Sequence, residues 1–445
     1  MKQVWIVSVL LSVSLNLAAQ DDFDTTFDDA GFDDWDVLFE EEAPTGWQAL
    51  GITGFAESRA GVRLQESELR DRVTLAELRL SLEKQWQWQQ GSAKLAADLL
   101  YDEPASTQKP DIQDGKGWLD LRQAWVQRRL GSVDVKAGRQ LLTWGVGDLL
   151  FINDLFGKDW VSFLLGRDEQ LLKVPTDAFK LSLFHNAVNA DLVYVPRFVS
   201  DRYISGERVI YYSPLCGELV GRNQVLDVMR PDKDNAEWSA RLYQTKGRFE
   251  WALYGYRGFW KSPGGFDLTT GAAIFPRLNV YGASLRGPVG PGLLSVELGY
   301  YASIEDSDGS DLAINNSEAR LLLGYELSTG DHSSLNMQYY AEALQDYDAY
   351  RDNLMAEQSP RDEYRQVVTA RYTHQALADR LTLSTMAFYS PTDRDIYLRA
   401  STNYEFNDAW SVEAGLGLFS GDDAHTFYAQ FEDNSNLYLM ARFSF

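Results

Sequence analysis

Hydrophobic and polar residues alternate with a period of two through most of the chain after Trp47. The clearest case is the C-terminal segment, in which an apolar series alternates with a more polar one: Leu437, Leu439, Ala441, Phe443 and Phe445 against Tyr438, Met440, Arg442 and Ser444. Similar segments occur at 76–83, 294–301, 396–406 and 412–418. Because successive side chains of a strand point to opposite faces, each segment predicts a β-strand with one apolar and one polar face.

Short polar links alternate with long polar stretches between these segments. The short links are 89–92, 130–132, 185–188, 245–248, 287–292, 329–333, 374–379 and 406–408, and the long stretches are 104–117, 141–176, 197–235, 260–276, 303–316, 345–361 and 420–434. Bacterial membrane barrels have short periplasmic turns and long extracellular loops in this order. Counting between the links gives about eighteen strands, or sixteen if the first hairpin or segment 133–140 is not β-structure.

This pattern predicts an all-β protein, a transmembrane antiparallel β-barrel over residues 47–445. No apolar stretch of eighteen residues follows the N-terminus, which excludes a helical membrane protein. In hydrocarbon every backbone N–H and C=O group must be paired within the protein, so the sheet must close on itself. A barrel of this size is too wide for side chains to fill, and a channel is its default function.

The N-terminus predicts export. Lys2, an apolar run and Ala18-Ala19 match a secretory signal peptide over residues 1–19. Residues 20–46 form an acidic segment, and residues 21–42 contain no Lys or Arg. The segment is either a solvated linker or a periplasmic docking site; the candidate docking residues are Phe23, Phe27, Trp35 and Phe39.

Charge and cysteine content narrow the function classes. The formal net charge of −24 argues against nucleic-acid binding, because phosphate recognition needs a basic surface. Cys216 is the single cysteine and cannot form an internal disulfide. None of the four histidines has a metal-ligand spacing and no Gly-x-Ser-x-Gly occurs, so the sequence predicts no enzyme, no catalytic residue, no metal and no cofactor. A lipase with a Ser-His-acid triad is the enzymatic alternative.

Charged residues on the polar faces of the strands are candidates for the solute path. By parity the lumen-facing arginines are Arg79, Arg122, Arg128, Arg241, Arg320, Arg399 and Arg442. Because a charge facing lipid is costly, these side chains should point inward whatever their function. Two interpretations are open: a lumen wall of mutually paired charges, or arginines along one wall that guide anionic solutes.

Alternation fails after Ala137. Arg139 would follow Val133, Val135 and Ala137 towards lipid, which predicts a bulge or a position above the membrane. The Gly-rich text that follows permits a turn into a short helix beginning near Asn153 and Asp154. This segment forms either a constriction folded into the pore or a surface cap; its candidate residues are Trp144, Asp148, Asn153, Asp154 and Lys158. Loop 197–235 is predicted to be either a lid or surface decoration.

The text GRQLLTWGVGD after the hairpin WLDLRQAWVQRRLGSVDVK resembles the alginate-export and related porin-like outer-membrane barrel families. The resemblance implies a large barrel in the outer membrane of a Gram-negative bacterium. The alginate exporters select an acidic polysaccharide with an arginine-rich lumen, whereas acids are interleaved with the arginines in this chain. The terminal Phe445 resembles the signal by which the barrel-assembly machinery recognises its clients.

Two functions remain open at this point. One is a channel for polar or anionic solutes in which inward-folded loops narrow the lumen. The other is the outer-membrane component of an export or envelope assembly, which docks a periplasmic partner through residues 21–42. In both cases the surrounding partner is outer-membrane lipid.

Overall fold

The computed structural model describes residues 46–102, 109–354 and 359–445. The predicted signal peptide and the candidate docking residues Phe23, Phe27, Trp35 and Phe39 lie outside the described residues.

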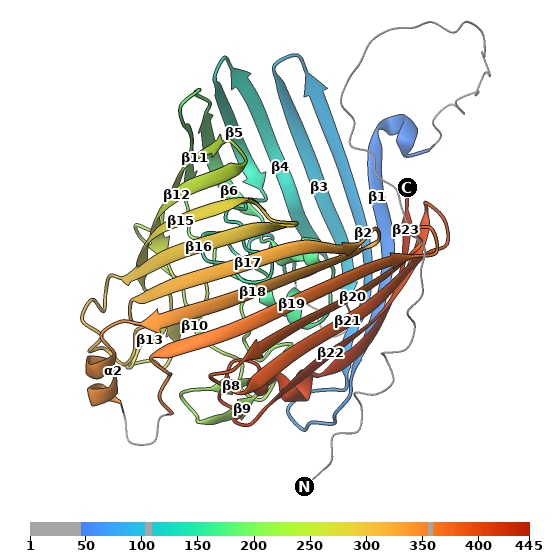
Figure 1. Cartoon of the computed structure of the whole chain (residues 1–445). Coiled ribbons are helices and arrows are strands. Elements are labelled where there is room, and N and C mark those ends of the chain that lie inside the picture. Colours follow the sequence, from blue (N-terminus) through green and yellow to red (C-terminus); the bar gives the residue numbers. More distant parts are fainter. Residues whose placement is uncertain (1–45, 103–108, 355–358) are drawn as a thin grey trace, which may run out of the picture.

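Eighteen antiparallel strands form one closed sheet (Figure 1). Each strand pairs with the next along the chain, and β1 pairs with β23 to complete the ring. The strands are β1 (Ile52–Arg63), β2 (Val73–Trp88), β3 (Gly91–Asp102), β4 (Leu119–Leu130), β5 (Val133–Gln140), β6 (Thr176–Leu183), β7 (Asn189–Val195), β11 (Glu237–Lys246), β12 (Phe249–Phe259), β15 (Arg277–Val289), β16 (Gly292–Ser303), β17 (Glu318–Gly330), β18 (Ser333–Leu344), β19 (Tyr364–Ala376), β20 (Leu381–Ser390), β21 (Asp395–Glu405), β22 (Trp410–Gly421) and β23 (Asn436–Ser444). The prediction of eighteen strands is confirmed, and sixteen is wrong.

Short turns and long loops lie at opposite ends of the barrel, as predicted, with the short turns at the upper end of the view in Figure 1. Two further connections at the long-loop end, 64–72 and 391–394, are absent from the predicted set. The remaining elements are η1 (Gln48–Leu50), α1 (Trp160–Leu164), η3 (Glu169–Leu172), β8 (Tyr211–Ser213), β9 (Glu218–Val220), β10 (Val228–Met229), β13 (Gly265–Phe266), β14 (Ala273–Ile274), α2 (Tyr347–Asn353) and η4 (Ala429–Asn434). Among the described residues, no helix is long and apolar enough to cross a membrane.

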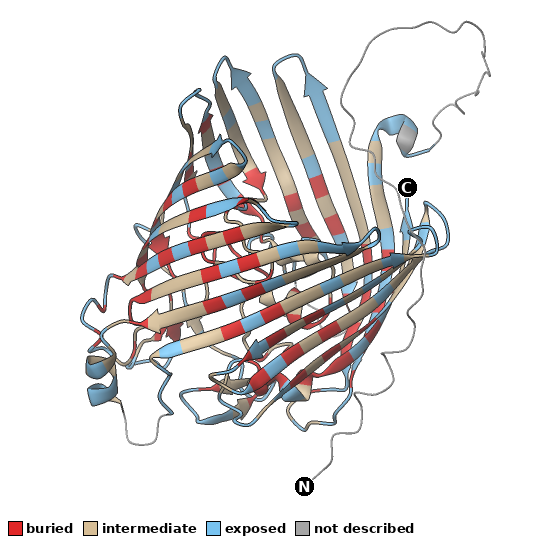
Figure 2. Cartoon of the chain, in the orientation of Figure 1, coloured by how far each residue is buried: buried red, intermediate tan, exposed pale blue. Residues whose placement is uncertain are grey.

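Exposed and buried residues alternate along the strands (Figure 2). On β23, for example, Leu437 and Leu439 are exposed whereas Tyr438 and Met440 are buried. Exposed aromatic residues gather towards both ends of the outer face: Trp86, Trp88, Phe406 and Trp410 near the short turns, and Tyr101, Trp118, Trp238, Tyr281 and Tyr364 near the long loops. An apolar outer band between two aromatic girdles is typical of a barrel in a lipid bilayer.

Arg128 does not face the lumen, and its predicted orientation is wrong. The pairing of β3 with β4 shifts between Ala96 and Ala97, which leaves Arg122 as an extra residue on β4. A bulge of one residue inverts the parity of everything after it. Arg128 therefore shares the outer face with its partner Val135 and with Val126, which is 55% exposed.

Candidate functional site

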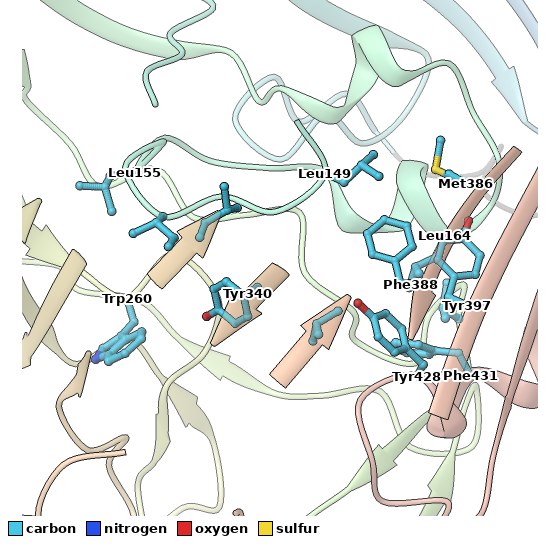
Figure 3. Close-up of a cluster of buried hydrophobic side chains, with 14 of the residues drawn as sticks. Leu149, Leu155, Leu164, Trp260, Tyr340, Met386, Phe388, Tyr397, Tyr428 and Phe431 are labelled. Atoms are coloured by element: carbon cyan, nitrogen blue, oxygen red, sulfur yellow. The ribbon is translucent and has the colours of Figure 1, made fainter. Parts of the chain in front are cut away.

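The segment between β5 and β6, residues 141–175, lies inside the barrel and is called the inner loop here. Its apolar side chains Leu149, Ile152, Leu155, Leu164 and Leu165 are buried in one cluster with inward-facing residues of the wall (Figure 3). These wall residues come from seven strands, β15 and β17–β22: Leu278, Val280, Leu322, Tyr340, Val367, Met386, Phe388, Tyr397 and Phe419. Of the two predicted arrangements, a constriction folded into the pore and a surface cap, the structure places the segment inside the barrel.

Glu297 on β16 holds the middle of the inner loop. One carboxylate oxygen accepts hydrogen bonds from the backbone N–H groups of Val146 and Gly147, the latter at 2.8 Å. The other accepts from the backbone N–H of Asn153 at 2.9 Å and from its side-chain amide at 3.1 Å. The Asn153 amide also reaches Ala283 O at 3.2 Å, and Asn153 is fully buried. One wall carboxylate thus satisfies four donors of a loop that has little regular structure of its own.

Two inward-facing glycines let the inner loop approach the wall closely. A Cβ at Gly282 would lie 1.8 Å from Asn153 Oδ1, and a Cβ at Gly299 would lie 2.5 Å from Ile152 Cγ2. Real Cβ atoms essentially never come this close, so a larger residue at either position on β15 or β16 would displace the docked loop. The Tyr301 hydroxyl beside them donates a hydrogen bond to Ile152 O.

A second cluster fixes the start of the inner loop to another sector of the wall, formed by β6, β7 and β12. Trp144 is 6% exposed, and its ring lies 5.1 Å from Phe156 and 6.1 Å from Tyr254 on β12. Buried residues of β6 and β7 complete this cluster: Ala178, Val193 and Val195. The inner loop therefore contacts both halves of the wall.

Five wall arginines converge on segment 166–173 of the inner loop; they are called the collar arginines here. Each donates to one acceptor or more of that segment: Arg59 to Gly166 O at 2.5 Å, Arg122 to Gln170 O at 3.2 Å and Lys173 O at 3.0 Å, Arg371 to Glu169 Oε2 at 3.0 Å, Arg399 to Arg167 O at 3.0 Å and Arg442 to Asp168 Oδ2 at 2.9 Å. They come from β1, β4, β19, β21 and β23, on both sides of the seam where the barrel closes. Guanidinium groups suit this task because each offers several donors in a planar fork.

The helix inside the loop begins later than predicted. α1 starts at Trp160, and its N-cap is Asp159, whose Oδ1 accepts from Ser162 N at 2.8 Å. The predicted starting residues Asn153 and Asp154 are not helical. Asn153 instead donates hydrogen bonds to Glu297 of the wall, and Asp154 forms an ion pair with Lys158 Nζ at 3.2 Å.

Loop 196–236, called the outer loop here, packs onto the inner loop. Asp159 and Arg202 form a parallel backbone bridge, and the Arg202 side chain reaches both Asp159 and Asp120 on β4. Arg208 forms an ion pair with Asp102 on β3. The outer loop thus contacts both the wall and the inner loop. Cys216 is exposed near the tip of its β8–β9 hairpin.

The predicted lumen arginines divide into groups. Arg122, Arg399 and Arg442 are collar arginines. Arg79 is linked to the same part of the inner loop, because Glu77 forms ion pairs with both Arg79 and Arg167. Two others lie in separate sectors. Arg241 pairs with Asp191 at 2.8 Å, and Arg320 pairs with Glu318 and lies 3.8 Å from the ring of Tyr301. Mutual pairing along the wall therefore accounts for most of these charges.

Sequence reasoning missed several residues that hold the loop. Arg59, Arg371 and Glu297 have the inward parity of their strands, but parity gives no sign of which inward charges meet a loop. The inward-facing apolar residues, such as Val367 and Phe388, were an available signal. A water-filled lumen needs polar residues, so an apolar patch on its wall indicates that chain covers it.

Docking of the inner loop shifts the pKa values of two of its aspartates in opposite directions. Burial raises the pKa of Asp148, and Arg371 only partly offsets this, so docking of the loop disfavours the charge. Burial also opposes ionisation of Asp168, but the Gln170 N–H and Arg442 outweigh it and lower the pKa. The stabilisation from Asp168 is present above the ordinary aspartate pKa and is lost as the pH falls through the lowered value.

Replacing Asp168 by Asn is therefore expected to loosen the inner loop at neutral pH, whereas Asp148→Asn leaves it docked. The measurement is the rate of maleimide labelling of a cysteine placed at Leu165, which is fully buried, in a Cys216→Ser background. Faster labelling is expected for Asp168→Asn alone. Equal acceleration by both substitutions would contradict the assignment.

The enzymatic alternative has no complete triad at the one histidine that meets a serine in the described chain. Ser333 Oγ lies 2.8 Å from His374 Nδ1, but Asp379 contacts His332 instead of His374. A serine nucleophile needs its histidine oriented by the acid. Within residues 46–102, 109–354 and 359–445, no three His, Cys, Asp or Glu side chains are placed to hold a metal ion.

No protein-family model and no curated protein matches this sequence. Solved structures do match. OccD3 (OpdP) of Pseudomonas aeruginosa is 12% identical with a TM-score of 0.50, over 89% of this chain and 91% of that one. OccK9 (OpdG) of the same organism is 12% identical with a TM-score of 0.51, over 88% of this chain and 96% of that one.

The fold is that of a porin-like outer-membrane β-barrel. The predicted resemblance to porin-like barrels is confirmed at the level of the fold. OccK3 (OpdO), also from Pseudomonas aeruginosa, adds a third likeness at 11% identity and a TM-score of 0.50. At such identities the porin-like barrel is shown as an architecture, and its solute is a separate question.

Proposed function

We propose that this porin-like barrel is an outer-membrane channel for small polar or anionic solutes, with a lumen narrowed by the inner and outer loops. The observation that carries the proposal is the inner loop itself. It crosses a closed barrel of eighteen strands and is held by wall side chains from several sectors, Glu297 on β16 and the collar arginines on β19, β21, β23, β1 and β4. A loop held in this way restricts passage by size and by charge.

The collar arginines support the preference for polar and anionic solutes. Arg371 and Arg442 keep 22% and 18% of their side chains exposed, so they are accessible from the space beside the loop. Among the described residues, Arg399 Nη1 and Arg122 Nη1 are buried without a hydrogen-bond partner. The exposed guanidinium groups of Arg371 and Arg442 offer N–H donors that a solute oxygen can accept from. The acids Glu405 and Glu413 line the same space at the short-turn end, which argues against a long polyanion as cargo.

The test is single-channel conductance of the purified protein in planar bilayers. Replacing residues 145–172 by a short Gly-Ser link is expected to raise the conductance several-fold, because the inner loop no longer crosses the lumen. Deleting the exposed hairpin tip 214–217 is the matched control and should leave the conductance unchanged.

Anion preference is measured as the reversal potential in a salt gradient. Replacing Arg399 and Arg442 by Gln should shift this potential towards cations. The proposed channel is wrong if the folded protein shows no conductance both with and without residues 145–172.

A further inference from the structure

A groove of about 470 Å³ lies on the outer face of the barrel, across β7, β11, β12 and β15 near their long-loop ends. Its floor is Ala240 and Gly255, which are paired with each other across β11 and β12. A Cβ at Gly255 would meet no atom within 4 Å, so the space above this glycine is open. Small residues thus hollow the surface where lipid would contact it.

Large apolar residues form the sides of the groove. Leu192 pairs with Ala240, and Tyr281 pairs with Gly255, so both lie on the same face as the floor. Tyr281 is 60% exposed. Trp238 lies towards the long loops, and its ring is tilted by 40° against that of Tyr194 with 4.5 Å between ring centroids. The apolar surface continues away from the long loops through Leu242 and Leu253, the next outward pair of the same strands.

Two arginines stand at the long-loop end of the groove. Arg257 lies between its strand partners Trp238 and Asn279, and among the described residues its side chain has no ion pair, hydrogen bond or ring contact. Arg277 is the first residue of β15, and its guanidinium carbon lies 5.5 Å from the ring of Phe259. A charge on the lipid face is tolerated near the interface and costly at mid-membrane, which places this end at headgroup level.

We propose that this groove binds an outer-leaflet lipid that carries a phosphate and acyl chains. The phosphate lies between Arg257 and Arg277, and an acyl chain lies over Ala240 and Gly255 beside Tyr281. Guanidinium groups bind phosphate through paired N–H donors, and basic residues at the membrane interface recognise anionic headgroups. The core of an interface between protein subunits is depleted of charge, so two arginines that have no ion pair among the described residues favour the lipid over a second copy of the chain.

The experiment is native mass spectrometry of the purified protein in nonionic detergent, titrated with bis-phosphorylated hexa-acyl lipid A. Phosphatase-treated lipid A and phosphatidylethanolamine are the comparison lipids. Arg257→Gln and Arg277→Gln are each expected to weaken lipid A binding about tenfold, the loss of a charge-assisted contact. Gly255→Leu fills the floor without a clash and should weaken both forms of lipid A.

Two matched controls should bind as the unmodified protein does. Arg394→Gln removes an exposed arginine from a turn at the same end, and Ala414→Leu enlarges a small outward residue on β22. Heat-modifiable electrophoretic mobility shows that each variant is folded. Equal binding of lipid A with and without phosphate would overturn the proposal. So would a dimer mass that disappears in Gly255→Leu, because the groove would then be a contact between copies of the chain.

Discussion

Replacing Glu297 by Gln is expected to release the middle of the inner loop and to raise the conductance of the barrel. The carboxylate accepts from three backbone N–H groups and one side-chain amide, and a glutamine can accept at only one of its two terminal atoms. Hydrogen bonds to a charged group contribute roughly 1.5–3 kcal/mol each. A loss of about 3 kcal/mol raises the undocked population roughly a hundredfold.

Two measurements follow the release of the loop. Conductance fluctuations report opening, and maleimide labelling of a cysteine at Leu149, in a Cys216→Ser background, reports exposure of the loop directly. Glu326→Gln is the control, because Glu326 is an acid on the adjacent β17 that pairs with Arg286 at 3.6 Å and not with the loop. If Glu297→Gln labels no faster than Glu326→Gln, the carboxylate is not the anchor that its contacts indicate.

A larger side chain at Gly299 is expected to displace the inner loop by a steric clash, whereas Glu297→Gln releases the loop by removing hydrogen bonds. Even alanine would place a carbon 2.5 Å from Ile152 Cγ2, and leucine would occupy the position of Ile152 itself. Overpacking of a well-packed site costs typically about 1–3 kcal/mol, and the flexible partner here is the loop and not the strand. Labelling at Leu149 and conductance should both rise from Gly299→Ala to Gly299→Leu.

Gly324→Ala is the control for this series, because its Cβ would meet its nearest neighbour at 3.5 Å, an ordinary contact. The barrel itself should stay folded in all three variants, which circular dichroism checks. A Gly299→Leu protein whose loop remains as protected as in Gly324→Ala would show that the wall can yield instead.

Much of the barrel could be predicted because the alternation of apolar and polar residues that marks each strand is a local pattern. Alternation at 437–445 and at 396–406 marks strands whose two faces meet lipid and lumen, and the structure has β23 and β21 at these places. The segment Val133–Gln140, one of the two places on which the choice between sixteen and eighteen strands depended, is β5 with the same bounds. Each assignment depended on a few consecutive residues and on the requirement for closure.

The interior could not be predicted in the same way, because it depends on contacts between distant residues. The bulge at Arg122 leaves no mark in the composition of β4, yet it inverts the orientation of Arg128. Asn153 is a residue type that often caps a helix. In the structure it hydrogen-bonds to the carboxylate of Glu297 instead. The collar arginines lie on five strands, and only the closed barrel brings them to one segment.

The seam between β1 and β23 has a consequence for the order of folding. Gly54 and Phe445 exchange two backbone hydrogen bonds of 3.0 Å, so the last residue of the chain completes the ring begun by the first strand. Arg59 and Arg442, on the two sides of this seam, both hold the inner loop. Such distant pairings form slowly, because the chain entropy of a long loop is lost before the contact stabilises it. Arg59 and Arg442 can therefore hold segment 166–173 together only once the seam has closed, late in folding.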